Sequence, residues 1–413
     1  MTHDHIDILS QLRRMRPAGD GQTEFSRETV AHWYAARQFL LNAKPPLDGD
    51  TGIAPSATRH VHAVLDGTSD MTLCLARQIA LMAHYPNFDD TTGANRSVIT
   101  IAYSRRETAD IIGLITREEY LCNLPLLCRR VMKTWDGSAE TTDGTANADS
   151  FIDIELELVD TGDTDRRRYM EWKCSQDDCT AITADDAERI AAAAGQGAAH
   201  TIDITDARRA NMVYHVGADI DNLTADDPTT AERYDRALQY FCYHLGPKTT
   251  LNTWNAFFSR ENGAPTQRAG SQQDVRNILS NVCCADCFEA RIRSVAGQAD
   301  IAETPTARYK KVSDAVRRNL KALVASEHAR WNVEKLIFGF MPLSASDSLH
   351  DECLFGEERQ AWRRQLKRRG VHIDLGSFRD LKRRNPGDIK YDCLLILAIP
   401  RILLTGKGNG KTL

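Results

Sequence analysis

Two apolar segments separated by a helical one constrain the fold more than any other feature of this sequence. His60–Asp66 reads HVHAVLD and Ser97–Tyr103 reads SVITIAY, and both have the apolar character of strands buried in a sheet. Between them, Met71–His84 has the length and apolar content of a helix that packs on such strands. A strand, a helix and a second strand in this order predict a Rossmann-like parallel sheet and an α/β fold. We place this nucleotide-binding domain at residues 59–245.

The turn after the first strand is a candidate ligand-binding loop. It begins with Gly67, and Ser69 and Thr72 stand where the dinucleotide-binding pattern GxGxxG has its second and third glycines. The fingerprint is therefore degenerate. Backbone amides at a helix N-terminus still attract phosphate, so we take Gly67, Thr68 and Ser69 as candidate ligand-binding residues.

The second strand ends in Ser104, Arg105 and Arg106. A fold of this kind that binds NAD usually carries an acidic residue there, which holds the ribose hydroxyls. Two arginines suit a phosphate instead, so they favour NADP or another phosphorylated nucleotide over NAD. The alternative, that Arg105 and Arg106 are surface residues opening the next helix, has equal weight.

Patterns elsewhere in the first 245 residues predict further elements of an α/β domain preceded by a helical extension at residues 1–58. The expected helices are Arg27–Lys44, Thr108–Lys133 with a break at Pro125, Thr183–Ala194, and Thr229–Leu245 with its tyrosine-rich face. The expected strands are Phe151–Asp160, Arg166–Lys173 pairing with it as a hairpin, His200–Ile204 and Met212–Val216, and Asp136–Ser150 is expected to be an exposed loop.

A long segment near the C-terminus, Lys310–Phe338, lacks proline and glycine and has apolar residues at helical spacing. Glu327, His328 and Trp331 lie at the edge of its apolar face, where a buried polar group needs a partner. One interpretation is that Glu327 and His328 hydrogen-bond to a following loop and hold a small domain together. The other is a ligand pocket, in which Trp331 stacks on a flat ring and Glu327 or His328 binds its polar edge.

This segment resembles the ryanodine-receptor (RyR) repeat domain in its bacterial form. The resemblance covers residues 306–405 approximately and rests on the pattern EHxRW, a following glycine and aromatic residue, and a later histidine with spaced apolar residues. The matching positions are Glu327, His328, Arg330, Trp331, Gly339, Phe340, His372, Leu375, Phe378, Leu381, Lys390, Tyr391 and Asp392.

The resemblance implies a small, mainly α-helical RyR-like domain, which we place at residues 306–413, after a helical or irregular connector at residues 246–305. It also implies a ligand sensor for nucleotide-derived molecules in antiviral or conflict systems. The ligand-binding candidates that it adds are Glu327, His328, Arg330, Trp331 and His372.

Charge and cysteine content limit the partners and the compartment. From Ala307 onward the chain holds 22 Lys and Arg against 12 Asp and Glu, although its net charge is −5, so the last domain would attract an anion. The basic runs Arg363–Arg369 and Arg379–Arg384 lack interleaved aromatic residues, so nucleic-acid binding is not expected. No signal peptide or membrane span is predicted, so we expect a cytoplasmic protein without membrane association and with reduced cysteines. A single CxxC motif, Cys284–Cys287, does not predict a metal site.

Three functions are compatible with these patterns. The first is a nucleotide sensor, in which a phosphorylated nucleotide or dinucleotide binds the Rossmann-like domain, the RyR-like domain or both and shifts domain packing or oligomeric state. The second is a scaffold for a partner protein or for homo-oligomers, with a vestigial Rossmann-like domain. The third is an NADP-dependent or nucleotide-processing enzyme, which lacks support because no nucleophile or catalytic motif is present. We therefore expect no catalytic residues, and favour the sensor.

Overall fold

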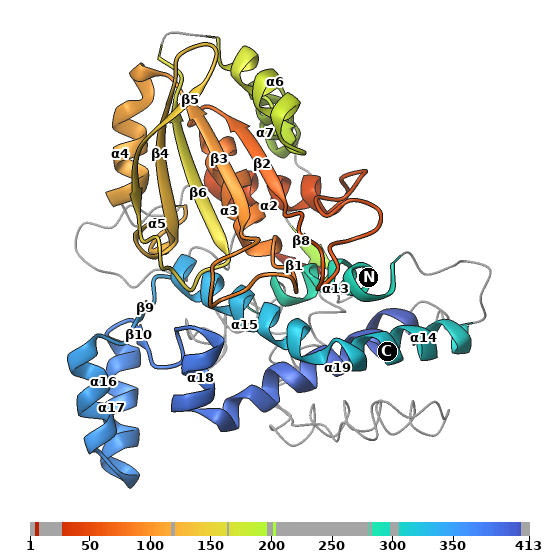
Figure 1. Ribbon diagram of the computed structural model, residues 1–413, viewed down its shortest axis with the longest axis vertical. Helices are drawn as coiled ribbons and strands as arrows, with labels where there is room; N and C mark the ends of the chain where they lie inside the picture. Colours follow the sequence, from red (N-terminus) through yellow and green to blue (C-terminus); the bar gives the residue numbers. More distant parts are fainter. Residues whose placement is uncertain are drawn as a thin grey trace, which may run out of the picture. The chain divides into compact units, whose positions relative to one another are not determined.

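The computed structural model describes most of the chain, in two compact units (Figure 1). One unit comprises Met1–Ala57, Glu188–Glu327 and Lys390–Leu413, and the other comprises Thr58–Ala187 and His328–Ile389. The described residues are 5–7, 27–116, 120–162, 165–195, 201–203, 280, 283–297 and 305–405. The predicted strand Met212–Val216 and the predicted helix Thr229–Leu245 lie outside them.

The second unit contains a sheet of six strands in the spatial order β5-β4-β6-β3-β2-β7. The strands β4, β6, β3, β2 and β7 run parallel to one another, and β5 runs antiparallel to β4 at one edge (Figure 1). Together with the surrounding helices, this mixed and mostly parallel sheet confirms the α/β class. The strands are β2 (His62–Asp66), β3 (Ser97–Tyr103), β4 (Arg129–Trp135), β5 (Glu140–Ala146), β6 (Ile154–Asp160) and β7 (Thr180–Ile182).

The two strands predicted from their apolar content, with a helix between them, are present in the sheet. β2 and β3 pair in parallel and are joined by helix α3 (Asp70–Met82), as the pattern predicts. All seven residues of β3 are buried, as are those of α3 from Met71 to Leu81. Burial on both faces is what a central strand of a parallel sheet requires.

Two elements near the antiparallel edge differ from the prediction. The expected helix Thr108–Lys133 is instead α4 (Thr108–Thr116), a short α5 (Leu124–Leu127) and then strand β4. The expected loop Asp136–Ser150 contains β5. The loop-like composition of β5 is compatible with an exposed edge strand, because hydrogen bonds to β4, rather than apolar packing, hold it in place.

The predicted hairpin strand Arg166–Lys173 is also wrong, because this segment begins helix α6 (Arg166–Gln176). The Asp165 carboxylate caps the helix by accepting a hydrogen bond from the Arg167 N–H. Tyr169 and Met170 then pack against Val64, Ala102, Trp135 and Val159 of the sheet. Consecutive residues of a strand point to opposite faces of its sheet, so Tyr169 and Met170 can both pack on this cluster, with Trp172 beside them, because the segment is a helix.

A disulfide joins Cys174, in the last turn of α6, to Cys179, just before β7. The expectation that the cysteines stay reduced is therefore wrong for this pair. That expectation rested on the compartment, whereas the Cα atoms of the two residues lie 5.2 Å apart, within the usual range for a disulfide.

Charged side chains form a buried network between the sheet and α6. Glu157 of β6 accepts a hydrogen bond from Thr100 of β3, at 2.9 Å, and pairs with Lys133 of β4. Lys173 of α6 lies 3.8 Å from Glu157 and 3.1 Å from Glu140 of β5, which also contacts Lys133. Four strands and a helix are thereby linked through two carboxylates and two ammonium groups.

The remaining elements are mainly helical. The predicted helix Lys310–Phe338 is interrupted at Asn319, which separates helix α14 (Pro305–Arg318) from helix α15 (Leu320–Ile337). None of the helices among the described residues is both long enough and apolar enough to cross a lipid bilayer.

Antiparallel β1 (His5–Asp7) and β8 (Thr201–Asp203) form a small sheet, and parallel β9 (Met341–Pro342) and β10 (Val371–His372) form another. The other helices are α2 (Arg27–Leu41), α7 (Ala184–Gly195), α13 (Phe288–Ala296), α14 (Pro305–Arg318), α15 (Leu320–Ile337), α16 (Ala345–Cys353), α17 (Gly356–Arg368), α18 (Phe378–Arg384) and α19 (Ile389–Thr405).

The buried network predicts a large effect of removing one carboxylate. Glu157→Ala leaves the ammonium groups of Lys133 and Lys173 with one buried carboxylate between them, so we expect the free energy of unfolding to fall by about 3 kcal/mol. Glu171→Ala is the control, because this α6 residue is exposed and its nearest cation lies 4.0 Å away. Urea denaturation of both variants measures the difference, and equal stability of the two would contradict a network that supports the fold.

Candidate functional site

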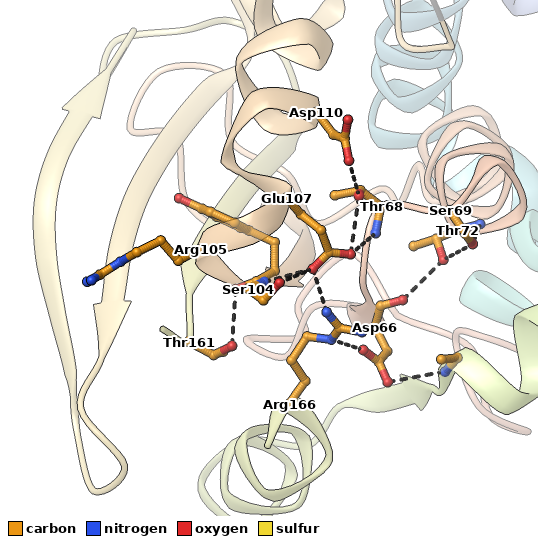
Figure 2. Close-up of polar contacts among 12 residues, drawn as sticks. Asp66, Thr68, Ser69, Thr72, Ser104, Arg105, Glu107, Asp110, Thr161 and Arg166 are labelled. Carbon is orange, nitrogen blue, oxygen red and sulfur yellow. Dashed lines mark hydrogen bonds and ion pairs between the residues drawn. The ribbon is translucent and has the colours of Figure 1, made fainter. Parts of the chain in front are cut away.

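The carboxyl ends of β2, β3, β6 and β7 lie at one edge of the sheet, and the loops that follow them carry a cluster of polar residues (Figure 2). The spatial order changes direction at β2, because β3 lies on one side of it and β7 on the other. In open α/β sheets, ligands bind outside the carboxyl ends of the strands at such a point. This end of the sheet, called the carboxyl edge below, is the candidate functional site.

Gly67 makes the turn after β2. Its φ of +79° lies in the left-handed region, and its N–H donates to the carbonyl of Ala102 at 2.8 Å. A Cβ atom there would lie only 3.2 Å from Oε1 of Glu107. Ser69 then caps α3 by accepting a hydrogen bond from the Thr72 N–H. Glycine and serine at these positions are therefore explained by the turn and the cap.

The Glu107 carboxylate lies at the centre of the cluster. Its Oε1 accepts hydrogen bonds from the backbone N–H of Thr68 at 3.2 Å and from the Thr68 hydroxyl at 3.3 Å. Its Oε2 accepts from the backbone N–H and the hydroxyl of Ser104, each at 2.8 Å. The sequence pattern predicts that the Thr68 amide binds a phosphate. In the structure, this amide binds a carboxylate of the chain itself.

Arg166, at the start of α6, joins two carboxylates of the cluster. Its Nε donates to Asp66 at 2.5 Å, and its Nη1 donates to Glu107 (Figure 2). The other oxygen of Asp66 accepts a hydrogen bond at 3.3 Å from the N–H of Ala184, which begins helix α7 (Ala184–Gly195) after β7. The Thr68 hydroxyl also contacts Asp110 of α4, at 3.0 Å. Segments at the carboxyl ends of four strands, β2, β3, β6 and β7, thereby meet through carboxylates.

The pKa of Glu107 follows from these contacts. Burial acts to raise the pKa, but the hydrogen bonds from Ser104, the charge of Arg166 and the Thr68 N–H outweigh it and hold the pKa below the ordinary value of 4.5. The carboxylate is therefore ionised at neutral pH. Asp66, Glu107 and Asp110 together make this edge acidic, so it offers acceptors to hydroxyl groups rather than donors to phosphate.

Arg105 and Arg106 open a short 3-10 helix, η1 (Arg105–Glu107), and both are exposed. The backbone N–H of Arg105 donates to the Gly162 carbonyl at 3.2 Å. Figure 2 shows the Arg105 guanidinium pointing away from Glu107 and Arg166. The two arginines are therefore exposed to solvent beside the acidic cluster. The arginine that pairs with Glu107 is Arg166.

Sequence reasoning missed Asp66, Glu107, Asp110 and Arg166. A signal for Glu107 is nonetheless present, because SRRE at residues 104–107 has the spacing of a capping box, and the structure contains that box. Nothing in the local pattern links Arg166 to it, since the two residues are brought together by the parallel pairing of β3 with β6.

Glu327 is buried in the other unit. It pairs with Arg291 of α13, and both side chains are almost completely inaccessible to solvent. The Cys284 thiol lies 3.5 Å from its other oxygen. Cys284 and Cys287 of the CxxC motif are both buried, and among the described residues no three His, Cys, Asp or Glu side chains are grouped as a metal ion would require.

His328 holds a loop of its own unit. Its Nε2 lies 3.0 Å from the carbonyl of Gly376, and Asn332, one turn later, donates to the same carbonyl at 2.8 Å and accepts from the Gly376 N–H at 3.3 Å. Two residues of one helix thus bind both backbone groups of Gly376. The first interpretation, that Glu327 and His328 both bond to a following loop, therefore corresponds to the structure for His328, whereas Glu327 pairs with Arg291 of the preceding helix α13.

The aromatic and charged residues beside His328 are packed together. Trp331 stacks on His328 and meets His372 edge to face, with ring centroids 4.8 Å apart. Burial, together with nearby Lys335, lowers the pKa of His372 to about 3, so this imidazole is neutral. Arg330 pairs with Glu334, which is fully buried and also bonds Lys335 at 2.6 Å.

Comparison with other proteins identifies no relative. No family model, curated protein or solved structure matches this chain.

The lowered pKa of Glu107 predicts a pH-dependent contribution to stability. A carboxylate with a depressed folded pKa stabilises the native state above its ordinary pKa of 4.5, and this contribution is lost as pH falls through the folded value. We therefore expect Glu107→Gln to be less stable than the native protein at pH 7, with the difference narrowing between pH 5 and pH 3. Urea midpoints measured across this range test it, with exposed Glu171→Gln as control. A difference that is constant with pH would rule out the charge of Glu107 as the cause.

The burial of Glu327 gives a second prediction. Glu327→Ala leaves the Arg291 guanidinium buried without its carboxylate, so we expect a loss of about 3 kcal/mol in the free energy of unfolding. Glu289→Ala is the matched control, because it removes a carboxylate that is exposed on the same helix as Arg291. If Glu327→Ala folds as stably as the control, Glu327 is available to a ligand rather than committed to the fold.

Proposed function

We propose that the protein is a nucleotide sensor, which binds a phosphorylated nucleotide at the carboxyl edge of its sheet. The observation that carries the proposal is the pair of carboxylates, Asp66 and Glu107, joined by Arg166 at the point where the strand order changes direction. The position is the one that α/β proteins use for such ligands, and the chemistry suits a sugar. The same proposal assigns a Rossmann-like domain and an RyR-like domain to the chain.

The contacts suggest an orientation for the ligand. Ribose hydroxyls would donate to Asp66 and Glu107, as they do to the acidic residue of dinucleotide-binding folds. A phosphate would be repelled by these carboxylates, so it would lie farther out, against the exposed guanidinium groups of Arg105 and Arg106. NADP, which carries a phosphate on a ribose, fits this arrangement better than NAD.

Sensing is favoured over turnover because the polar side chains at this edge already form hydrogen bonds and ion pairs with one another. Glu107 accepts four hydrogen bonds from neighbouring loops in addition to its ion pair with Arg166. A ligand that binds Asp66 or Glu107 competes with Arg166 and changes the contact between loops. Such a change would shift the population of two loop arrangements, which is the physical basis of a sensor in an antiviral or conflict system.

A second candidate function is a scaffold for a partner protein or for further copies of the chain. It is favoured by the Thr68 N–H, which already donates to Glu107, and by the Arg105 side chain, which points away from the cluster. In this case the sheet edge is a vestigial nucleotide site, closed by its own carboxylate.

A thermal-shift screen against NADP, NAD, ADP-ribose and cyclic nucleotides separates the two. A nucleotide at about 100 times its dissociation constant stabilises the native state by about 2.7 kcal/mol, and we expect Arg105→Ala/Arg106→Ala to lose this effect. The control, Arg364→Ala/Arg368→Ala, removes the same charge from exposed positions on α17.

Three outcomes decide the matter. Absence of any shift in the native protein favours the scaffold. An equal shift in the Arg105→Ala/Arg106→Ala variant places the nucleotide elsewhere. Chromatography of the nucleotide after incubation completes the test, because recovery of altered product would replace a sensor with an enzyme.

A further inference from the structure

A pocket of about 300 Å³ lies among α16, α17, the loop after β10 and α18, away from the carboxyl edge of the sheet. Four of its lining residues are arginines, contributed as pairs by two helices: Arg359 and Arg363 from α17, and Arg383 and Arg384 from α18. The pocket is at the small end of the range for ligand sites, large enough for a phosphate with a sugar-sized group.

The α17 pair is held in place by one carboxylate. Asp351 of α16 accepts hydrogen bonds from Nε and Nη2 of Arg359, at 3.1 and 2.9 Å. It also accepts two from Arg363, both at 2.8 Å. The hydrogen bond from Arg363 is the main reason that the pKa of Asp351 lies below its ordinary value. Asp351 thereby fixes both guanidinium groups at the wall, and one negative charge faces two positive ones.

The α18 pair has unused hydrogen-bonding capacity. The Nε of Arg384 is buried and makes no hydrogen bond, and its Nη2 reaches only the Leu375 carbonyl, at 3.4 Å. Arg383 is 70% exposed and contacts Asp380 at 3.4 Å. A buried guanidinium N–H without an acceptor is costly, so this group calls for a bound acceptor.

Two other carboxylates line the pocket, Glu352 and Asp374. Asp374 accepts a hydrogen bond from Asn385 at 3.2 Å, and burial raises its pKa above the ordinary value. Asp351 is bonded to the two arginines of α17. Because four arginines line the pocket against three carboxylates, its net charge is positive. Like-charged guanidinium groups converging on one cavity are the usual arrangement for binding an anion.

Helix α15 does not line this pocket but holds the loop between β10 and α18, which does. His328 and Asn332 bind the carbonyl of Gly376, next to Leu375, whose carbonyl accepts from Arg384. A Cβ atom on Gly376 would lie 2.4 Å from Nη2 of Arg384, so the glycine lets the guanidinium pack against the loop. His328 and Asn332 are positioning residues for Arg384.

We propose that this pocket binds the phosphate of a small phosphorylated molecule, at a site distinct from the carboxyl edge of the sheet. The planar guanidinium groups of Arg383 and Arg384 donate to the phosphate oxygens, and the α17 pair supplies further positive charge. The enclosure by three helices selects a small molecule over a polymer. The proposal does not depend on what the sheet binds.

Calorimetric titration of the full chain with sodium pyrophosphate, at constant ionic strength, tests the proposal. We expect saturable binding to the native protein, and a dissociation constant at least about ten-fold higher for Arg383→Ala/Arg384→Gln. Arg364→Ala is the matched control, because it removes an exposed charge from α17 one residue beyond Arg363. Arg383→Ala alone serves if the double variant does not fold, since Arg383 is largely exposed.

Each outcome supports or overturns the site. Weakened binding in the α18 variants, with unchanged binding in Arg364→Ala and in Arg105→Ala/Arg106→Ala, supports it. No binding to the native protein, or equal binding to the α18 variants, overturns it. Because Arg105 and Arg106 belong to the sheet site, their variant shows which of the two sites has failed.

Discussion

The contact between the Glu107 carboxylate and the Thr68 amide is the interaction on which the carboxyl edge depends. It links the loop after β2 to the loop after β3, and Arg166 extends the link to the start of α6. In a phosphate-binding fold, the turn after the first strand is left open for an anion from outside. Here the anion belongs to the chain, so the loops are ordered before any ligand arrives, and a ligand must match or displace that carboxylate.

The strand order explains how this interaction is possible. β6 lies next to β3, so the segment that follows β6 starts beside η1 and brings Arg166 to Glu107. β7 lies on the far side of β2, so helix α7, which follows β7, begins with its Ala184 N–H beside Asp66. Residues about 100 positions apart in sequence thus form one cluster because parallel strands deliver their ends to the same edge.

What could be predicted from the sequence depends on the kind of force that holds each element. β2, α3 and β3 follow from their apolar content, because burial against neighbours determines them. β4 and β5 were missed, because Lys133 and Glu140 are held there by charges on other strands, which no local pattern contains. Arg166 was missed for the same reason, whereas Gly67, Thr68 and Ser69 were located correctly at the turn and the start of α3.

The α15 helix shows the complementary case. Glu327 and His328 were singled out by their position on an apolar face, and Arg330 by the resemblance alone. Each has a protein partner: Arg291 for Glu327, Gly376 for His328 and Glu334 for Arg330. The pattern indicated that these groups need partners. It could not indicate which, because a ligand and a neighbouring helix satisfy the same chemistry.

The edges of the sheet also bear on how copies of the chain can associate. At one edge, β5 is polar and exposed, and its pairing with β4 contains an irregularity between Met132 and Lys133. At the other edge of the described sheet, β7 has only three residues. Short, polar and irregular edge strands are how natural proteins prevent sheets from joining. Association by strand addition is therefore disfavoured at both edges of the six-stranded sheet that the structure describes.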